Sequence, residues 1–407
     1  MGTTDQISSN TSIPPTTPAP APGPPAVAQG TAAVSQAGAS SITAPELIVR
    51  MLSSSTNVSD LIVSPVRVPQ VEVTGQLIPV PGLPVLSPTE TARIAGEIIG
   101  GNKHSLETLR NDGAADLSYS LPRVARFRVN IFKQRGTYAI VMRVIPTGVP
   151  KFEDLNLPAQ LRQIAELKNG LVLVTGPTGS GKSSTLAAII DLINSEKAYH
   201  IITIEDPLEF IHTHKKSTIH QRELHSDTPS FALALRASLR QAPKVVLVGE
   251  MRDRETTEIA LTAAETGHLV LSTLHTIDAA KTVERIIGQF DLSEQDVIRN
   301  RLAQTFRYIV SQRLLPRLDG KGRIAAVEIL KSTIRSREYV IKGETGDFSL
   351  LDAMRDGDMD GMQDFDTVIE TLVRCGEISM ETGLAYATNP GNLRLTMSDL
   401  ADPDFER

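Results

Sequence analysis

Residues Gly176–Ser184 read GPTGSGKSS, and this stretch is the strongest indication of the fold. It fits the pattern G-x-x-x-x-G-K-[ST], in which Lys182 and Ser183 are the last two positions. The apolar run 171–174 precedes it and the apolar run 185–190 follows it, so the local order is strand, glycine loop, helix. Glycines let backbone N–H groups turn toward a polyphosphate, and a helix N-terminus adds its positive dipole end. We therefore predict a nucleotide-phosphate site in preference to a purely structural glycine turn.

The side chains of this loop have separate predicted roles. The ammonium of Lys182 reaches the β- and γ-phosphates, and the hydroxyl of Ser183 can ligate Mg²⁺. The residues expected to line the bound nucleotide are Gly176, Pro177, Thr178, Gly179, Ser180, Gly181, Lys182, Ser183 and Ser184.

Composition bounds the class of protein. The chain has 407 residues, 41% of them hydrophobic, which is enough for two ordinary domains and a tail. Its net charge of −6 is unlike the positive charge of proteins that bind nucleic acids, so a nucleic-acid partner is not expected. The single cysteine, Cys375, excludes a disulfide framework and a four-cysteine zinc site. No apolar run approaches the ~20 residues of a membrane helix, and no signal-peptide pattern is present, so we expect a cytosolic protein without membrane insertion.

Composition also divides the chain into five segments. Residues 1–42 are rich in Pro, Ala, Thr and Ser, and we predict a disordered tail because so few apolar groups cannot offset the entropy of ordering. Residues 43–147 predict a small α+β domain, and 148–156 a linker. Residues 157–395 alternate apolar strands with helices, which predicts a doubly wound, mostly parallel α/β sheet. Residues 396–407 form an acidic C-terminal end.

Three carboxylates follow the expected strand 201–204, and strand ends of this kind are where open α/β sheets place ligands. They are Glu205, Asp206 and Glu209. They suit an Mg²⁺ shell or a water-orienting role, although Asp206 can instead cap a turn before Pro207.

A fourth carboxylate, Glu250, follows the apolar run Val245–Val248 and is separated from it by one glycine. An acid at such a strand tip can accept a proton from the water that attacks the γ-phosphate, which is worth ~10²–10⁴-fold in rate. We predict Glu250 as this base, while Arg252 and Asp253 can be an ordinary ion pair that starts the next helix.

Histidines bracket the expected strand 269–273. His275 follows the strand and can reach the γ-phosphate; His268 precedes it and is a second candidate, although most histidines are structural. A further group, comprising His212, His214, His220 and His225, fits no metal-ligand spacing and is predicted to be a polar surface loop.

Three arginines of the smaller domain, Arg126, Arg128 and Arg135, lie on or beside expected strands. Surface arginines are usually only solvated. A hydrolysing phosphate-loop enzyme, however, often needs a guanidinium on its transition state, and a neighbouring subunit can supply it, worth ~10³–10⁵-fold.

Six motifs occur in one order along the chain: GPTGSGKSSTLAAIID, HIITIEDPLEF, HKKSTIHQRE, LVGEMRD, ALTAAETGHLVLSTLHT and SQRLLPR. Together they resemble the motifs of the secretion ATPases, and most of all the twitching-motility (retraction) ATPases of type IV pili, the PilT and PilU group. The resemblance runs from about residue 59 to 395 and includes YSLPRVARFRVNIFKQRG in the smaller domain.

The resemblance implies a PAS-like N-terminal domain joined to a RecA-like ATPase domain. It implies a ring of six subunits that binds ATP and Mg²⁺ between the two domains, with a neighbouring subunit completing each site. The matching residues are Glu205, Asp206 and Glu209 in an aspartate box, Glu250 as the Walker B glutamate, His268 and His275 in a histidine box, and Arg126, Arg128 and Arg135 near the phosphates. Those expected to hold Mg²⁺ are Ser183, Glu205 and Glu250.

The function implied is a hexameric motor whose ATP hydrolysis powers pilus retraction at the cytoplasmic face of the bacterial inner membrane. Its expected partners are an inner-membrane platform protein and, indirectly, pilin. Two alternatives stay open: an assembly or secretion ATPase of the PilB/GspE kind, which usually carries a four-cysteine zinc insertion, and a ring subunit that binds nucleotide without hydrolysing it. A DNA-translocating motor is disfavoured by the acidic composition.

The sequence departs from the family pattern in three places. Lys244 stands where the family usually has Asp, and we expect an altered loop charge rather than lost catalysis. The retraction signature AIRNLI does not occur as such in the matching region 333–343, which leaves a PilU-like paralogue open. The N-terminal tail is an addition.

Overall fold

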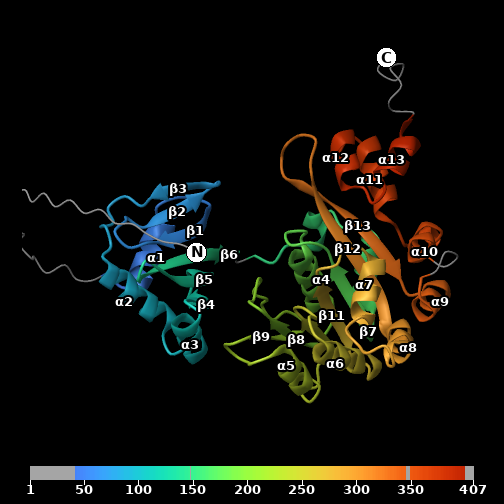
Figure 1. Cartoon of the computed structure of the whole chain (residues 1–407), viewed down its shortest axis with the longest axis horizontal. Helices are drawn as coiled ribbons and strands as arrows, with labels where there is room; N and C mark the ends of the chain where they lie inside the picture. Colours follow the sequence, from blue (N-terminus) through green and yellow to red (C-terminus); the bar gives the residue numbers. More distant parts are fainter. Residues whose placement is uncertain (1–41, 147, 345–348, 399–407) are drawn as a thin grey trace, which may run out of the picture. The chain divides into compact units, whose positions relative to one another are not determined.

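The computed structural model describes residues 42–146, 148–344 and 349–398. The predicted tail, apart from Ile42, lies outside the described residues, as do 399–407 of the acidic end. Two β-sheets organise the described chain, one of six strands in the N-terminal part and one of seven strands after it (Figure 1).

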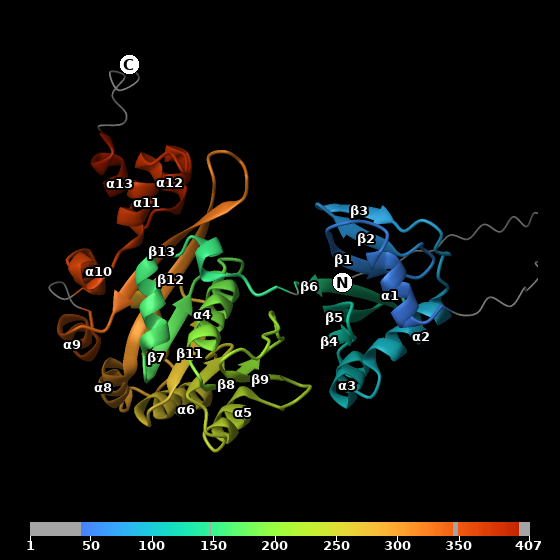
Figure 2. The ribbon, with the colours of Figure 1, turned by 180° about the vertical axis from the view of Figure 1, so that it is seen from behind.

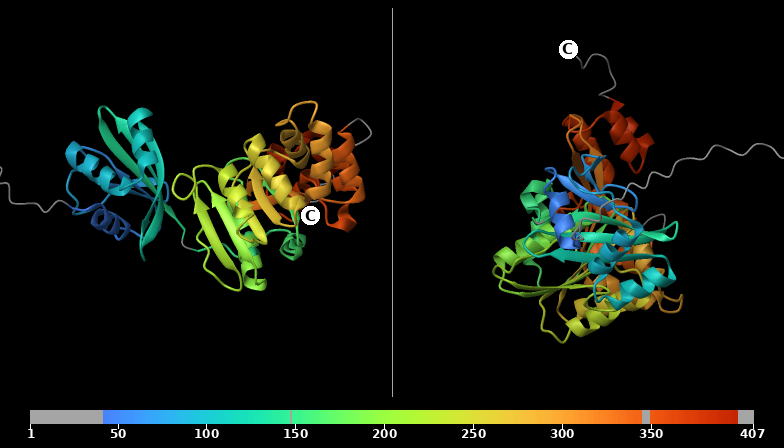
Figure 3. Two further views of the ribbon diagram at one scale, coloured as in Figure 1. Left: turned by 90° about the horizontal axis from the view of Figure 1, so that it is seen from below. Right: turned by 90° about the vertical axis from the view of Figure 1, so that its left-hand side faces the viewer.

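The six-stranded sheet is antiparallel throughout, in the order β3-β2-β1-β6-β5-β4. Its strands are β1 (Val58–Val63), β2 (Gln70–Val73), β3 (Gln76–Pro79), β4 (Ala114–Leu121), β5 (Ala125–Gln134) and β6 (Thr137–Ile145). Its helices are α1 (Ala44–Leu52), α2 (Pro88–Ile99) and α3 (Lys103–Asn111), which gather on one face of the sheet (Figure 3). The predicted α+β character of this part is confirmed.

Strand β5 shows how one face of this sheet is buried and the other is not. Phe127, Val129 and Ile131 are fully buried in the core beneath the helices. Because side chains alternate along a strand, Arg126 and Arg128 lie on the opposite face.

The seven-stranded sheet has the order β13-β12-β7-β11-β10-β8-β9. Its strands are β7 (Gly170–Thr175), β8 (His200–Glu205), β9 (Thr218–Glu223), β10 (Val245–Val248), β11 (Leu269–Leu274), β12 (Phe306–Pro316) and β13 (Arg323–Lys331). Only β13 is antiparallel to its neighbour, so the predicted doubly wound, mostly parallel sheet is confirmed.

Helices cover both faces of this sheet (Figure 2). One face packs against α4 (Lys182–Glu196) and two 3₁₀ segments, η1 (Phe152–Leu155) and η2 (Ala159–Glu166). The other face packs against α5 (Phe231–Ser238), α6 (Arg254–Glu265), α7 (Ala279–Ile287) and α8 (Gln295–Thr305). Strands β7, β10 and β11 are buried at every residue, as expected of a sheet with two covered faces.

The remaining helices follow the β12–β13 hairpin. They are α9 (Ile334–Lys342), α10 (Leu350–Arg355), α11 (Phe365–Arg374), α12 (Met380–Tyr386) and α13 (Pro390–Thr396), with the 3₁₀ turn η3 (Asp358–Asp360) between α10 and α11. Phe365, Ile369 and Leu393 pack against Leu315 and Ile324 of the hairpin. None of the helices in the described ranges is long and apolar enough to cross a membrane.

Parallel pairing places the predicted site segments at one edge of the sheet. Thr175 of β7 pairs with Leu274 of β11, and Val248 of β10 pairs with Ser272 of β11 and Ile204 of β8. The residues that directly follow these strands are therefore neighbours in space, although they lie far apart in sequence.

The prediction of a polar surface loop for the histidine-rich stretch is wrong for 218–223. That segment is the edge strand β9, paired in parallel with β8, and it includes His220. Its polar composition is accommodated because an edge strand has one open side.

Candidate active site

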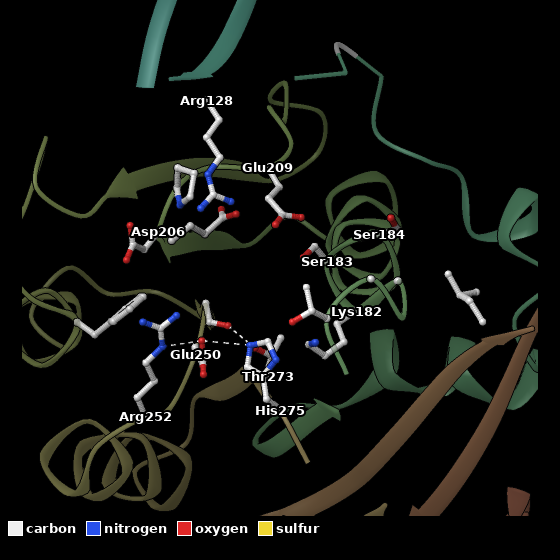
Figure 4. A pocket seen from close by; sticks show the side chains of 18 of the residues that line it. Arg128, Lys182, Ser183, Ser184, Asp206, Glu209, Glu250, Arg252, Thr273 and His275 are labelled. Atoms are coloured by element: carbon white, nitrogen blue, oxygen red, sulfur yellow. Dashed lines mark hydrogen bonds and ion pairs between the residues drawn. The ribbon is translucent and has the colours of Figure 1, made fainter. Parts of the chain in front are cut away.

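A cavity of about 520 Å³ opens at the carboxyl edge of the large sheet (Figure 4). Its walls come from the phosphate loop, from the ends of β8, β10 and β11, and from single residues elsewhere. The residues that line the cavity include Arg128, Thr178, Gly179, Gly181, Lys182, Ser183, Ser184, Glu205, Asp206, Glu209, Glu250, Arg252, Thr273, His275 and Arg323. The structure thus brings together most of the predicted site residues.

The phosphate loop needs its glycines for conformation and for space. Gly176, Gly179 and Gly181 have φ values of +142°, +79° and +91°, which side-chain-bearing residues rarely adopt. A Cβ on Gly176 would lie 2.4 Å from the carbonyl oxygen of Gln312, and one on Gly181 would lie 2.9 Å from Nε2 of Gln312. The loop therefore forms a close-fitting cradle against β12, which fits a polyphosphate.

Lys182 is held at the start of α4 with its ammonium inside the loop. Nζ donates hydrogen bonds to the carbonyl oxygens of Gly176 at 2.9 Å and Pro177 at 3.0 Å. Burial lowers the pKa of Lys182 below its ordinary value, and the nearby carboxylates of Glu250 and Glu209 oppose that shift. A cation enclosed in this way suits binding of phosphate oxygens.

Gln312 supports the loop from β12, a role that the sequence did not predict. Its Oε1 accepts a hydrogen bond of 2.8 Å from the hydroxyl of Thr185 on α4, and the side chain is almost fully buried. It lies within the SQRLLPR motif, so the motif marked the segment without revealing this contact.

Glu250 lies between a guanidinium and an imidazole (Figure 4). Arg252 Nε donates to Glu250 Oε2 at 2.7 Å, and His275 Nε2 lies 3.5 Å from the same oxygen. The Glu250 side chain is only 17% exposed, whereas His275 is 45% exposed. This places a carboxylate of fixed orientation beside the loop, as a general base requires. Arg252 is thus a partner of Glu250 rather than of Asp253, which caps α6.

Glu205 is enclosed at the end of β8. Burial raises its pKa to about 7, and the hydrogen bond from Gln221 Nε2, at 3.4 Å, opposes this shift. Glu205, Glu250 and the hydroxyl of Ser183 all line the cavity. Oxygen ligands of this kind are those that Mg²⁺ takes, so the residues present fit the expected ion.

Three of the residues predicted to be catalytic do not line the cavity. His268 precedes β11 and lies at the opposite end of that strand from His275, roughly 20 Å away along six extended residues. Its Nδ1 contacts the carbonyl oxygen of Ala263 at 3.0 Å. Arg126 forms an ion pair with the buried Glu223 instead. Arg135 is exposed in the turn between β5 and β6, at the far end of β5 from Arg128.

Arg323 was missed by the sequence reasoning. It begins β13, lines the cavity and lies 3.5 Å, through Nη1, from the carbonyl oxygen of Gly179. Because the β12–β13 hairpin was not predicted, nothing in the local sequence pointed to this arginine.

Among the described residues, no group of three or more His, Cys, Asp or Glu side chains is arranged to hold a metal ion by itself.

The sequence profile of the family described as type II/IV secretion system protein matches residues 109–347. A twitching motility protein of Neisseria gonorrhoeae is 44% identical over 79% of this chain and 84% of its own length. The type IV pilus retraction ATPase PilT of Pseudomonas aeruginosa is 41% identical over 84% of this chain and 97% of its own length. This chain belongs to the type II/IV secretion system protein family.

A solved structure of the same family agrees with the fold. The crystal structure of the pilus retraction motor PilT with bound ADP has a TM-score of 0.78 and 39% identity, covering 87% of this chain and 99% of that one. The predicted resemblance to this group of ATPases and the RecA-like fold are confirmed.

The structure also places two of the departures from the family pattern. Lys244 is exposed and precedes β10, at the sheet edge away from the cavity. The region 333–343 forms α9 and its two capping residues. Neither departure contributes a residue to the lining of the cavity.

Proposed function

We propose that this family member is an ATP-hydrolysing motor that powers retraction of a type IV pilus. The observation that carries the proposal is the cavity in which the phosphate loop and the Glu250–His275 pair face the same space. A subunit that only binds nucleotide has no need of a carboxylate held in that position. Most of the chain, moreover, aligns with relatives named for twitching motility and pilus retraction.

In this mechanism, different residues of the chain bind the phosphates, accept the proton and stabilise the developing charge. Loop N–H groups and Lys182 bind the phosphates of ATP. Glu250, oriented by Arg252 and His275, accepts a proton from the attacking water. Arg128 and Arg323 add positive charge at the cavity wall as negative charge develops. Mg²⁺, held by Ser183, Glu205 and Glu250, would supply further neutralisation of the phosphate oxygens.

The working unit is proposed to be a ring of six subunits. Arg135 and His268 lie outside the cavity of their own subunit, so a role in hydrolysis requires a neighbouring subunit to bring them to another site. Arg126 compensates the charge of Glu223 within the subunit. The ring would act at the cytoplasmic face of the bacterial inner membrane on a platform protein, and through it on pilin.

Two experiments test this function. ATP turnover by the purified protein should exceed that of Glu250→Gln by 10²–10⁴-fold; equal rates would mean that the chain binds nucleotide without hydrolysing it. Deletion of the gene in its native host should give hyperpiliated cells whose pili do not retract. Cells without pili would instead identify an assembly ATPase, the alternative that the single cysteine disfavours.

A further inference from the structure

A buried carboxylate outside the cavity remains unexplained by the proposed mechanism. Glu328 lies in the middle of β13 and is 3% exposed. Burying an ionisable side chain is costly unless its polar atoms are satisfied. Burial raises the pKa of Glu328 to about 7 and Asp278 adds to this shift, while Ser311 and Arg313 of β12 oppose it.

Glu328 accepts a hydrogen bond from the first residue of α7. The backbone N–H of Ala279 donates to Glu328 Oε1 at 2.7 Å, and both residues are buried. The first N–H groups of a helix have no partner within the helix, and they form its positive end. The side chain of Glu328 therefore holds the beginning of α7 to β13 through this hydrogen bond.

Only three residues separate Ala279 from His275. Hydrogen bonds join this short segment to the first turn of α7. The hydroxyls of Thr276 and Thr282 lie 2.6 Å apart, and the Thr282 hydroxyl donates to the carbonyl oxygen of Asp278 at 2.7 Å. The loop that carries His275 is thus fixed to the start of α7, so it moves with that start.

The same threonine reaches the strand that leads into the phosphate loop. The hydroxyl of Thr282 lies 3.5 Å from that of Thr175, the residue before Gly176, and Thr175 donates to the hydroxyl of Ser311 at 3.1 Å. These side chains are fully buried, so no solvent competes for the contacts. The start of α7 is therefore held between β7 and β13.

We infer that Glu328 is a positioning residue that sets the place of His275 relative to Glu250 by anchoring the start of α7. Glu328 does not line the nucleotide cavity and acts through the Ala279–His275 connection. The inference rests on the proposed ATP hydrolysis for its effect on rate, but the placement of the loop can be tested without turnover.

The test compares Glu328→Gln with Glu328→Met in the full-length protein. Gln keeps an oxygen that can accept from Ala279, whereas Met fills a similar volume and cannot accept the bond. Hydrogen–deuterium exchange of the segment 275–282 is expected to rise at least tenfold in Glu328→Met and to stay within threefold of wild type in Glu328→Gln. Exchange of β10 should be unchanged in both.

Turnover supplies the second measurement. Displacing a positioned group by about 1 Å can cost ~10²-fold, so Glu328→Met is expected to lower kcat between tenfold and a hundredfold with KM within threefold. In a His275→Ala background the same substitution should change kcat less than twofold, because the group being positioned is gone. A general structural defect would lower kcat in both backgrounds.

Three results would overturn the inference: unchanged exchange at 275–282 in Glu328→Met, an equal loss of kcat with and without His275, or full activity of His275→Ala. If Glu328→Met does not fold, Ala279→Pro in the Glu328→Gln protein breaks the same hydrogen bond by removing its N–H donor, since proline is tolerated at the first position of a helix. Wild-type protein that hydrolyses no ATP would refute the proposed function, and the exchange data would still decide the role of Glu328.

Discussion

The phosphate loop offers two glycines at which the same substitution should have different costs. Gly176 and Gly179 both have positive φ, at +142° and +79°, but only Gly176 is crowded. A Cβ on Gly176 would lie 2.4 Å from the carbonyl oxygen of Gln312 and 2.6 Å from Oγ of Ser180. A Cβ on Gly179 would have no heavy atom within 4 Å.

These surroundings set the expected size of the effect. Alanine at either position adopts an unfavourable backbone conformation, which costs roughly 1 kcal/mol in the left-handed region of Gly179 and about 2 kcal/mol in the rarer region of Gly176. Overpacking against the backbone of β12 adds about 2 kcal/mol for Gly176 alone. Gly176→Ala should therefore be less stable than Gly179→Ala by about 3 kcal/mol.

Urea denaturation followed by far-UV circular dichroism is a suitable assay, because the chain has no tryptophan. Measurements without nucleotide separate stability from phosphate binding, and Gly267→Ala is a matched control, since Gly267 has φ of +101° and no neighbour within 4 Å. Gly179→Ala and Gly267→Ala should have similar transition midpoints, with Gly176→Ala well below them. Coincident midpoints for all three variants would refute the argument that contact with β12 fixes the loop.

Three further predictions concern the site and the charges around it. Arg128→Ala should lower kcat at least tenfold because it removes a guanidinium from the cavity wall, whereas Lys133→Ala, on the same strand but outside the cavity, should leave kcat unchanged in the same turnover assay. Ser183→Ala should raise the Mg²⁺ concentration needed for half-maximal binding of a fluorescent ATP analogue by ~10-fold, with binding in EDTA unaffected; identical Mg²⁺ curves would remove Ser183 from the metal site. Because burial raises the pKa of Glu328 from 4.5 to about 7, its contribution to stability is complete below pH 4.5 and is lost as the pH rises to 7. Relative to Glu328→Gln, wild type should therefore lose about 3 kcal/mol of unfolding free energy over this range, and parallel pH profiles in denaturant titrations would contradict this. Burial lowers the pKa of His212 to about 4, so its contribution to stability changes with pH in the opposite direction. This contribution is the same in wild type and Glu328→Gln, so it does not affect the difference between them.

Elements with strong local patterns were predicted closely. The sequence pattern predicts helices at 44–52 and 88–99, and these are the bounds of α1 and α2, since each has a capping box at its start and a regular apolar face. Helix α3 was missed: its sequence, KHSLETLRN, is mostly polar and buries only two residues. Strands β9, β12 and β13 were missed because β9 is a polar edge strand and the hairpin breaks the strand–helix alternation on which the prediction depended.

Local sequence was enough to predict the nucleotide loop, the parallel sheet and the carboxylates at the strand ends, because each lies in a contiguous run with a fixed local period. His268 was assigned to the site although it precedes its strand, and the length of an extended strand separates it from His275. Which arginines line the cavity depends on how the strands are arranged in three dimensions. Arg126 and Arg128 share one face of β5, and the contact with Glu223 that removes Arg126 comes from a strand about a hundred residues away. The same holds for Gln312, Arg323 and Glu328, whose partners are brought to them by sheet order, a long-range property that no local pattern encodes.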